Sequence, residues 1–267
     1  MTEIDVRPDL SVERHGAVAC VRIDRGTPVN ALRPETMCEL TSVLDTLESD
    51  DTVRAIILGY HGRHFTAGAE LSFLESLKSA SEDRIRNEIY RHFQNAVKRL
   101  YQCPKPTIAA IGGAAVTVGC ELALACDFRI VTEHASFQES WIRLGLMAPL
   151  GGMKKLPALV GYGLATDMML RGRAVGGAEA VSAGLAHRLV VPGDLDAEAL
   201  ALGGELAALA PLAYRAIKAG LHHGLENDFE TNFAKGLDSQ CRLIQSEDFR
   251  EGVDAVLGKY SPRFRGC

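Results

Sequence analysis

The sequence predicts an α/β protein that becomes wholly helical near its C-terminus. Short apolar runs rich in β-branched residues, such as Val53 to Leu58, are typical of buried strands. They alternate with longer segments in which apolar residues recur at helical spacing. From Asp194 onward the sequence shows helical patterns and little strand character. With 267 residues, 47 % of them hydrophobic, the chain is long enough to bury a sizeable core.

The first predicted elements are a hairpin and an amphipathic helix. The hairpin joins Leu10 to Arg14 with Val18 to Ile23 through a turn that contains a glycine. Pro34 suits the first position of a helix, and the helix is expected to end near Ser49. Its buried stripe is predicted from the apolar residues Met37, Leu40, Val43, Leu44 and Leu47.

The middle of the chain continues the alternation of helices and strands. Ser81 can cap a helix that runs to Leu100. Buried strands are predicted at Thr107 to Ile111 and at Phe128 to Val131. The helices of the C-terminal part are expected at residues 195–210, 212–222 and 229–243. We therefore divide the chain into an α/β core, residues 1–192, and a helical region, residues 193–267, which belongs to the same functional unit.

Charge and cysteine content narrow the classes of function. The net charge is −5, and the sequence has no cluster of lysine and arginine with interleaved aromatic residues. We therefore expect no nucleic-acid partner. The seven cysteines are scattered and lack the spacing of metal ligands. We therefore expect no bound metal and expect the cysteines to be reduced thiols. Residues 1–10 show no pattern of a secretion signal. These observations predict a cytoplasmic protein.

The most informative stretch is the apolar run from Thr107 to Asp127. Gly112-Gly113 and Glu121 interrupt it, so it is not expected to span a membrane. We expect a strand, a turn that contains glycine and a helix from about Gly119 to Cys126. A buried carboxylate is costly unless it is paired, protonated or used. Glu121 is therefore expected to meet a buried arginine, to cap its own helix, or to act as a general acid/base.

Three stretches match the motifs of one known family in order and spacing: Pro28 to Leu32, the His64 to Leu71 segment HFTAGAEL, and Pro104 to Asp127 with its GCELALACD end. In these motifs the chain resembles the crotonase or enoyl-CoA hydratase/isomerase superfamily, over essentially its whole length. The resemblance implies a spiral of strand-strand-helix units that forms two roughly perpendicular sheets. It also implies a C-terminal helical region that packs trimers, often paired into hexamers.

The resemblance further implies an acyl-CoA thioester substrate and an enolate intermediate, with coenzyme A as part of the substrate and no separate cofactor. Glu121 matches the family's first catalytic carboxylate. The backbone N–H groups of Ala69 and Val118 match the two donors of the oxyanion hole. Around them we expect substrate contacts from Ala67, Gly68, Gly119 and Trp141, and contacts to the CoA phosphates from Arg25 and Lys259, for which simple solvation is the alternative.

Two departures from the family pattern concern the chemistry. The usual glycine triplet before the Cys-Glu pair is Thr117-Val118-Gly119, and a β-branched residue resists positive φ. Trp141 stands where hydratases of the family carry a second glutamate. We expect its side chain to form a wall of the acyl pocket or to be a plain core residue. Glu139 is interpreted first as a solvated loop acid, and as the second carboxylate only if the loop is shifted.

The predicted function is therefore an enzyme of the enoyl-CoA hydratase/isomerase type, with Glu121 as acid/base. A family decarboxylase or hydrolase that acts on a bulkier acyl-CoA is the alternative, because the second glutamate is absent from its usual place. A homologue that binds acyl-CoA without turnover is a third hypothesis.

Overall fold

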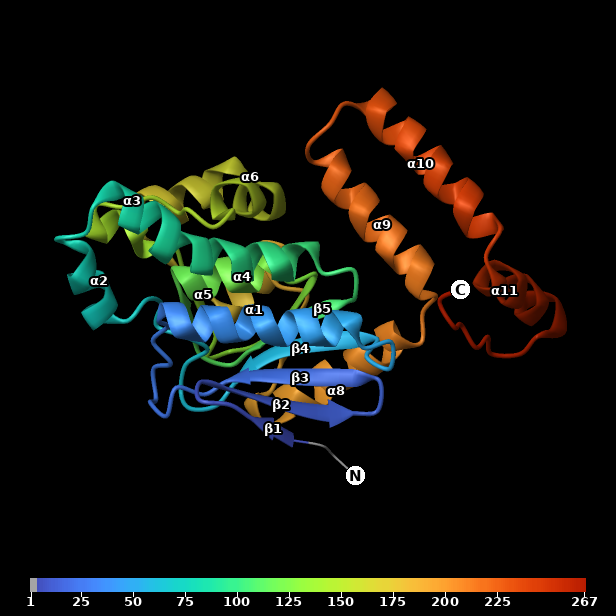
Figure 1. Ribbon diagram of the computed structural model, residues 1–267, viewed down its shortest axis with the longest axis horizontal. Helices are drawn as coiled ribbons and strands as arrows, with labels where there is room; N and C mark the ends of the chain where they lie inside the picture. Colours follow the sequence, from blue (N-terminus) through green and yellow to red (C-terminus); the bar gives the residue numbers. More distant parts are fainter. Residues whose placement is uncertain (1–3) are drawn as a thin grey trace.

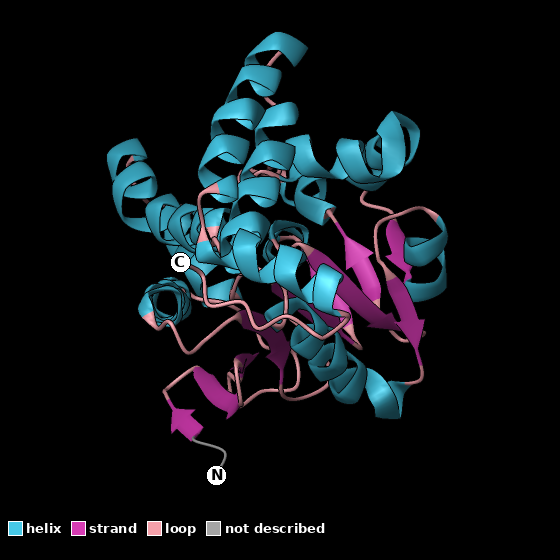
Figure 2. Ribbon diagram, turned by 90° about the vertical axis from the view of Figure 1, so that its right-hand side faces the viewer, coloured by secondary structure: helices cyan, strands magenta, loops and turns pink. Residues whose placement is uncertain are grey.

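The computed structural model describes residues 4–267, with side chains for all of them except Ile4, Glu88 and Ile89 (Figure 1). The first three residues of the predicted 1–192 core therefore lie outside the described part of the chain. Figure 2 shows the strands running from the lower left of the molecule, near the N-terminus, to its right-hand side, with helices above them and on both sides.

The larger sheet contains seven strands, which lie side by side in the order β1 (Ile4–Val6), β2 (Leu10–His15), β3 (Val18–Ile23), β4 (Ala55–Tyr60), β5 (Thr107–Ile111), β7 (Phe128–Thr132) and β10 (Arg188–Val190). The strands β1 to β3 pair antiparallel, which confirms the predicted hairpin, and all later pairs are parallel. A separate small sheet joins β6 (Ala114–Val116), β8 (Ser136–Gln138) and β9 (Ala174–Gly176).

The helices follow the strands in an α/β alternation and then dominate the C-terminal part. They are α1 (Pro34–Ser49), α2 (Leu71–Leu77), α3 (Glu82–Arg84), the π-helix η1 (Ile85–Tyr90), α4 (Arg91–Gln102), α5 (Val118–Ala125), the 3₁₀ helix η2 (Ser140–Leu144), α6 (Gly152–Arg171), α7 (Gly177–Ser182), the 3₁₀ helix η3 (Pro192–Asp194), α8 (Leu195–Ala207), α9 (Pro211–Gly224), α10 (Phe229–Ile244) and α11 (Glu247–Gly258).

The central strands of the large sheet, β3, β4, β5 and β7, are buried on both faces, as their apolar sequences predict. Successive residues of a strand point to opposite faces. Accordingly, Val18 and Cys20 of β3 pack in a cluster with α8, whereas Ala19 and Val21 join the main core with α1, α4 and α5. This two-sided burial explains why the parallel strands are nearly continuous apolar runs rather than alternating ones.

The long helix predicted from Ser81 is present, but it is not uniform. The Ser81 hydroxyl accepts a hydrogen bond from the backbone N–H of Arg84, which confirms the predicted cap. The chain then passes through the π-helical turn η1 before it continues as α4. A π turn widens the helix by one residue, and helical spacing alone does not reveal it.

The helices after residue 192 do not form one structural unit. The first helix after residue 192, α8, covers the large sheet and contributes Leu195 and Ala199 to the core. The next helix, α9, packs against the body, where Lys218 donates to the Asp127 carboxylate at 2.7 Å. The helix α10 packs beside α9, and α10 and α11 project from the body (Figure 1). The division at residue 192 stays a prediction. Within the described chain no single helix is long and apolar enough to cross a membrane.

Candidate active site

The short helix α5 begins at an unusual backbone turn. Thr117, just before it, has φ 48° and ψ −106°, a conformation that β-branched residues rarely adopt. Val118 is the first helical residue, so the positive φ falls on Thr117 and not on Val118. The β-branched side chain of Val118 therefore leaves its backbone in an ordinary helical conformation.

The loop Ala67 to Ala69 lies directly against the start of α5. Thr66 donates its backbone N–H to the Ala114 oxygen at 3.0 Å and accepts from the Val116 N–H at the same distance. Gly68, with φ +94°, approaches so closely that a Cβ there would lie 2.2 Å from the Thr117 hydroxyl oxygen. Only glycine suits this position.

Two backbone N–H groups are left free where these segments meet. Thr66 bridges to Ala115 in parallel register, so Ala69 and Val118 each follow three residues after the bridge. Among the described residues, no acceptor takes a hydrogen bond from the N–H of Ala69 or of Val118. Free N–H groups at a helix start favour negative charge. This arrangement supports the predicted pair of oxyanion donors, which stays a prediction.

Of the other residues predicted to contact substrate near this turn, Ala67 is exposed and Gly119 is buried. A Cβ at Gly119 would lie 2.4 Å from the Thr66 methyl carbon. Gly119 therefore permits the close packing of α5 on the loop. The substrate contacts predicted for Ala67, Gly68 and Gly119 stay predictions.

Glu121 is buried, with 1 % of its surface exposed. Its Oε1 accepts backbone hydrogen bonds from Leu150 at 3.0 Å and Gly152 at 2.7 Å, whereas its Oε2 has no partner within residues 4–267. It therefore caps the start of α6 and not its own helix, and it meets no arginine. Burial raises the pKa of Glu121 to about 7, although the two N–H donors oppose the rise.

A second buried carboxyl lies beside Glu121. Glu139 is 1 % exposed, and its Oε2 accepts a 2.9 Å hydrogen bond from the Trp141 indole N–H. A Cβ at Gly152 would lie 2.8 Å from Glu121 Oε1 and 3.1 Å from Glu139 Oε1, so the two carboxyls converge on this glycine. Burial, followed by the charge of Glu121, raises the pKa of Glu139 well above its usual value.

The prediction that Glu139 is a solvated loop acid is therefore wrong. The small sheet brings this segment inward, and Ala135, Phe137, Glu139 and Trp141 are all buried while the residues between them are less so. The sequence contains this signal, since a period of two marks one face of a strand. A carboxylate in a buried position of such a pattern points to a functional or a protonated group.

A cavity of about 280 Å³ opens beside Glu121, between α4, α5 and the start of α6. Val97, Leu124 and Leu150 give it apolar walls, and Lys155 also lines it. Trp141 is not among its lining residues. The role of Trp141 as a pocket wall stays a prediction, whereas its indole holds Glu139. Within residues 4–267, no group of three His, Cys, Asp or Glu side chains could hold a metal ion.

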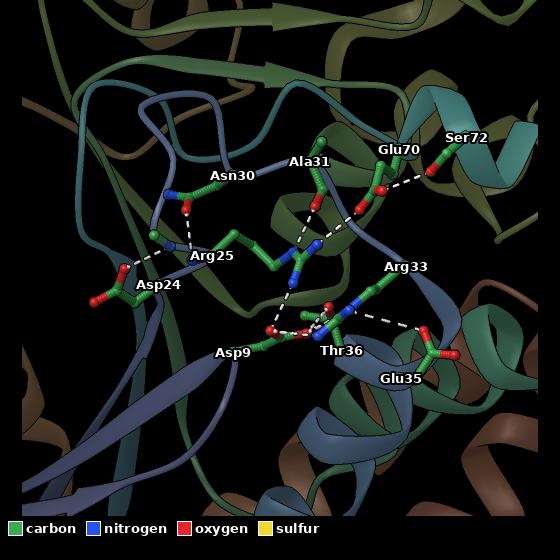
Figure 3. A network of polar contacts seen from close by, with 11 residues as sticks. Asp9, Asp24, Arg25, Asn30, Ala31, Arg33, Glu35, Thr36, Glu70 and Ser72 are labelled. Carbon is green, nitrogen blue, oxygen red and sulfur yellow. Dashed lines mark hydrogen bonds and ion pairs between the residues drawn. The ribbon is translucent and has the colours of Figure 1, made fainter.

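The predicted phosphate contacts lie apart from this cavity. Arg25 donates to the Asp9 carboxylate at 2.6 Å, to the Glu70 carboxylate at 2.7 Å and to the Ala31 carbonyl at 2.9 Å (Figure 3). Its guanidinium therefore serves the protein's own network. Lys259 ends α11, on the projecting helical part of the molecule (Figure 1). Within one chain the structure does not bring Arg25, Lys259 and Glu121 together, and both phosphate contacts stay predictions.

Comparison with known proteins identifies the family of the chain. The profile of the enoyl-CoA hydratase/isomerase family matches residues 13–266. The chain belongs to this family.

Individual relatives agree with this assignment to the enoyl-CoA hydratase/isomerase family. A putative enoyl-CoA hydratase of Thermus thermophilus is 36 % identical over 252 residues, which cover 93 % of this chain and 98 % of the relative. A crotonyl-CoA hydratase of Syntrophomonas wolfei is 31 % identical over 96 % and 97 % of the two chains. The crystal structure of a putative enoyl-CoA hydratase from Streptomyces coelicolor superposes with a TM-score of 0.92 at 31 % identity, over 98 % and 97 % of the chains.

These comparisons confirm the predicted superfamily, its α/β fold and an enzyme of the enoyl-CoA hydratase/isomerase family. The resemblance to the family predicts that Trp141 stands where hydratases carry a second glutamate, and this correspondence stays a prediction. The structure shows that a carboxyl is nevertheless present, since Glu139 reaches the same buried region two residues earlier.

Proposed function

We propose that this enzyme binds a 2-enoyl-CoA thioester and adds water across its double bond, or shifts that bond, through an enolate intermediate. Membership of the enoyl-CoA hydratase/isomerase family supports this class of reaction. The observation that carries the proposal is the buried carboxyl of Glu121. It lines a cavity, meets no cation among the described residues and follows one turn after the free N–H of Val118.

In the proposed hydration, the Glu121 carboxylate takes a proton from water as the water oxygen bonds to C3 of the substrate. The double-bond electrons move toward C2 and the thioester oxygen, where the N–H groups of Ala69 and Val118 stabilise the negative charge. Glu121 then returns its proton to C2, so that the net change is the addition of one water. In the bond shift, Glu121 takes a proton from C4 of the 2-enoyl ester, the electrons move to the thioester oxygen, and Glu121 returns the proton to C2, which leaves the double bond between C3 and C4.

Glu139 does not line the cavity, and we propose that it positions the proton of Glu121. Two carboxyls in one buried site cannot both ionise without a large cost. One proton shared between them keeps the other oxygen basic near neutral pH. The Trp141 N–H, which donates to Glu139 Oε2, favours one orientation of this carboxyl.

The alternative reaction is decarboxylation or hydrolysis of a bulkier acyl-CoA. Trp141 in place of the second glutamate favours it. The burial of Glu139 beside Glu121 weighs against it, because the site then holds two carboxyls after all.

We also propose that the substrate enters with coenzyme A and that the chains assemble as trimers or as pairs of trimers. The projecting helices support the second point. They expose large apolar side chains, which in soluble proteins mark surfaces of association: Phe229, Phe233 and Leu237 on α10, and Val253, Val256 and Leu257 on α11.

The test is the loss of the enone absorbance of crotonyl-CoA, with wild type and Glu121→Gln side by side. We expect wild-type turnover and a loss of about 10²- to 10⁴-fold in the variant, the usual contribution of a general acid/base. Glu133→Gln is a matched control, because the Glu133 side chain is 69 % exposed. Unchanged turnover in Glu121→Gln would remove Glu121 from the mechanism, and absence of turnover in wild type would favour the alternative reaction.

A further inference from the structure

A lysine without an ion-pair partner lines the cavity beside Glu121. The Nζ of Lys155, on the first turn of α6, lies 4.4 Å from the centroid of the Tyr101 ring. Among the described residues, this ammonium makes no hydrogen bond and no ion pair. Its neighbour Lys154, in contrast, is paired with Glu226 at 3.3 Å. An amphipathic cation over an aromatic ring is held in place while its N–H donors stay available.

The surroundings of Lys155 carry an excess of positive charge. Arg129, Lys218 and Asp127 all act on its titration, and Asp127 is already bound by Lys218 at 2.7 Å. Burial, followed by the charge of Arg129, lowers the pKa of Lys155 to about 8. The same kind of surroundings, burial first and then Lys155 and Lys218, lowers the pKa of His222 to about 4. The nearby carboxylates of Glu226 and Asp127 are already bound by Lys154 and Lys218, so among the described residues the ammonium of Lys155 is left without an anionic partner.

The cavity extends from Glu121, which lies one helical turn after Val118, to this lysine. Val118, Glu121 and Ala125 follow one another at helical spacing on one side of α5, and both Glu121 and Ala125 line the cavity. With a rise of 1.5 Å per residue, Val118 and Ala125 are about 10 Å apart along the helix. Lys155 lines the same cavity as Ala125, the last residue of α5.

We infer that this cavity takes an acyl chain that ends in a carboxylate, which pairs with the ammonium of Lys155. The inference rests on the proposed function, because the chain must start from a thioester held at Ala69 and Val118. The apolar walls, Val97, Leu124 and Leu150, suit the methylene groups between the two ends. The substrate class is thus the CoA ester of an unsaturated dicarboxylic acid.

The phosphates of coenzyme A are a second source of negative charge with the same chemistry. They are present in every CoA ester, whereas the terminal carboxylate is not. A pair of esters that differ only at the far end of the acyl chain therefore separates the two sources.

The experiment compares 2-octenedioyl-CoA with 2-octenoyl-CoA as substrates. We expect wild type to prefer the carboxylate-ended ester in kcat/KM, and Lys155→Met to lower that preference by about tenfold, the effect of losing a partly buried charge pair. Lys155→Arg should retain most of the preference. The control is Lys98→Met, which removes an exposed lysine of the same cavity and should change the preference by less than about twofold.

Three results would overturn the inference: a wild type that prefers the methyl-ended ester, a preference that survives in Lys155→Met, or an equal loss for both esters, which would assign Lys155 to the CoA phosphates. The first needs no variant to fold. Calorimetric binding of the saturated esters, octanedioyl-CoA and octanoyl-CoA, keeps the test separate from the proposed reaction. If neither unsaturated ester is turned over, the proposed function fails, while the binding preference still decides the inference.

Discussion

Two buried carboxyl groups of this protein lie in opposite surroundings. Asp9, with 2 % of its surface exposed, is bound by Arg25 at 2.6 Å, by Arg33 at 3.1 Å and by the Thr36 hydroxyl at 2.5 Å (Figure 3). Glu121 is buried to the same degree but accepts only two backbone N–H groups. Burial is therefore common to both sites, and the presence of cations separates them.

The difference appears in the titration of the two groups. Burial alone would raise the pKa of Asp9, but hydrogen bonds from Arg33, Thr36 and Arg25 outweigh it and leave this pKa below its usual value. At Glu121 burial prevails, and the pKa rises to about 7. The first carboxyl is fixed as an anion that holds the structure together. The second exchanges a proton near neutral pH, as acid/base chemistry requires.

The largest expected effect comes from breaking the Asp9 network. Asp9→Asn leaves the guanidinium groups of Arg25 and Arg33 beside a neutral amide, and removal of one partner from a buried ionic network costs about 4 kcal/mol. Urea unfolding measures this free energy. Glu35→Gln is the control, since Glu35 lies 3.9 Å from Arg33 with 72 % of its side chain exposed, and we expect a change below about 0.5 kcal/mol. A loss in Asp9→Asn as small as that of the control would contradict a structural role for this network.

The second effect is a pH dependence of stability that Asp9 does not share. A carboxyl whose pKa rises on folding, here from 4.5 to about 7, stabilises the fold fully below pH 4.5 and loses that contribution as the pH rises through about 7. At 1.36 kcal/mol per pH unit the loss is about 3 kcal/mol. The measurement is the free energy of unfolding of wild type relative to Glu121→Gln between pH 4 and pH 8.

Glu139→Gln sharpens this second prediction. Burial, helped by the charge of Glu121, raises the pKa of Glu139 well above its usual value, so this variant should lose the alkaline limb of the pH profile of crotonyl-CoA hydration. The rise near pH 7 should stay, because burial of Glu121 sets it. A role of Glu139 in packing alone would lower the rate and leave the pH profile in place.

The smallest expected effect concerns the link between the Asp9 network and the loop of Ala69. Glu70 binds Arg25 at 2.7 Å, but its side chain is 35 % exposed. Glu70→Gln should therefore cost less than about 1 kcal/mol of unfolding free energy. A loss of unfolding free energy as large as that of Asp9→Asn would contradict this prediction and would show that Glu70 stabilises the fold as much as Asp9 does.

The sequence predicted five of the seven strands of the large sheet, the C-terminal helices and the burial of Glu121, because each depends on local apolar spacing. It missed β1, β10 and the three short strands of the small sheet. It did not predict the partners of Arg25 or the burial of Glu139. Asp9, Arg25 and Glu70 are distant in sequence and meet only through the fold. Glu139 directly follows the strand β8, which has three residues and is too short for its period of two to stand out. The unpaired ammonium of Lys155 likewise depends on which of two adjacent lysines meets Glu226.

The backbone bonds that join Thr66 to Ala114 and Val116 have a consequence for local opening. The two proposed oxyanion donors come from segments about fifty residues apart in sequence, yet one seam of two hydrogen bonds aligns them. Segments joined in this way open as a cooperative unit, and their amide protons exchange with solvent at a common rate. When these two hydrogen bonds break, both proposed donors lose their alignment in a single opening event. Catalytic activity would then be lost while the rest of the fold stays closed.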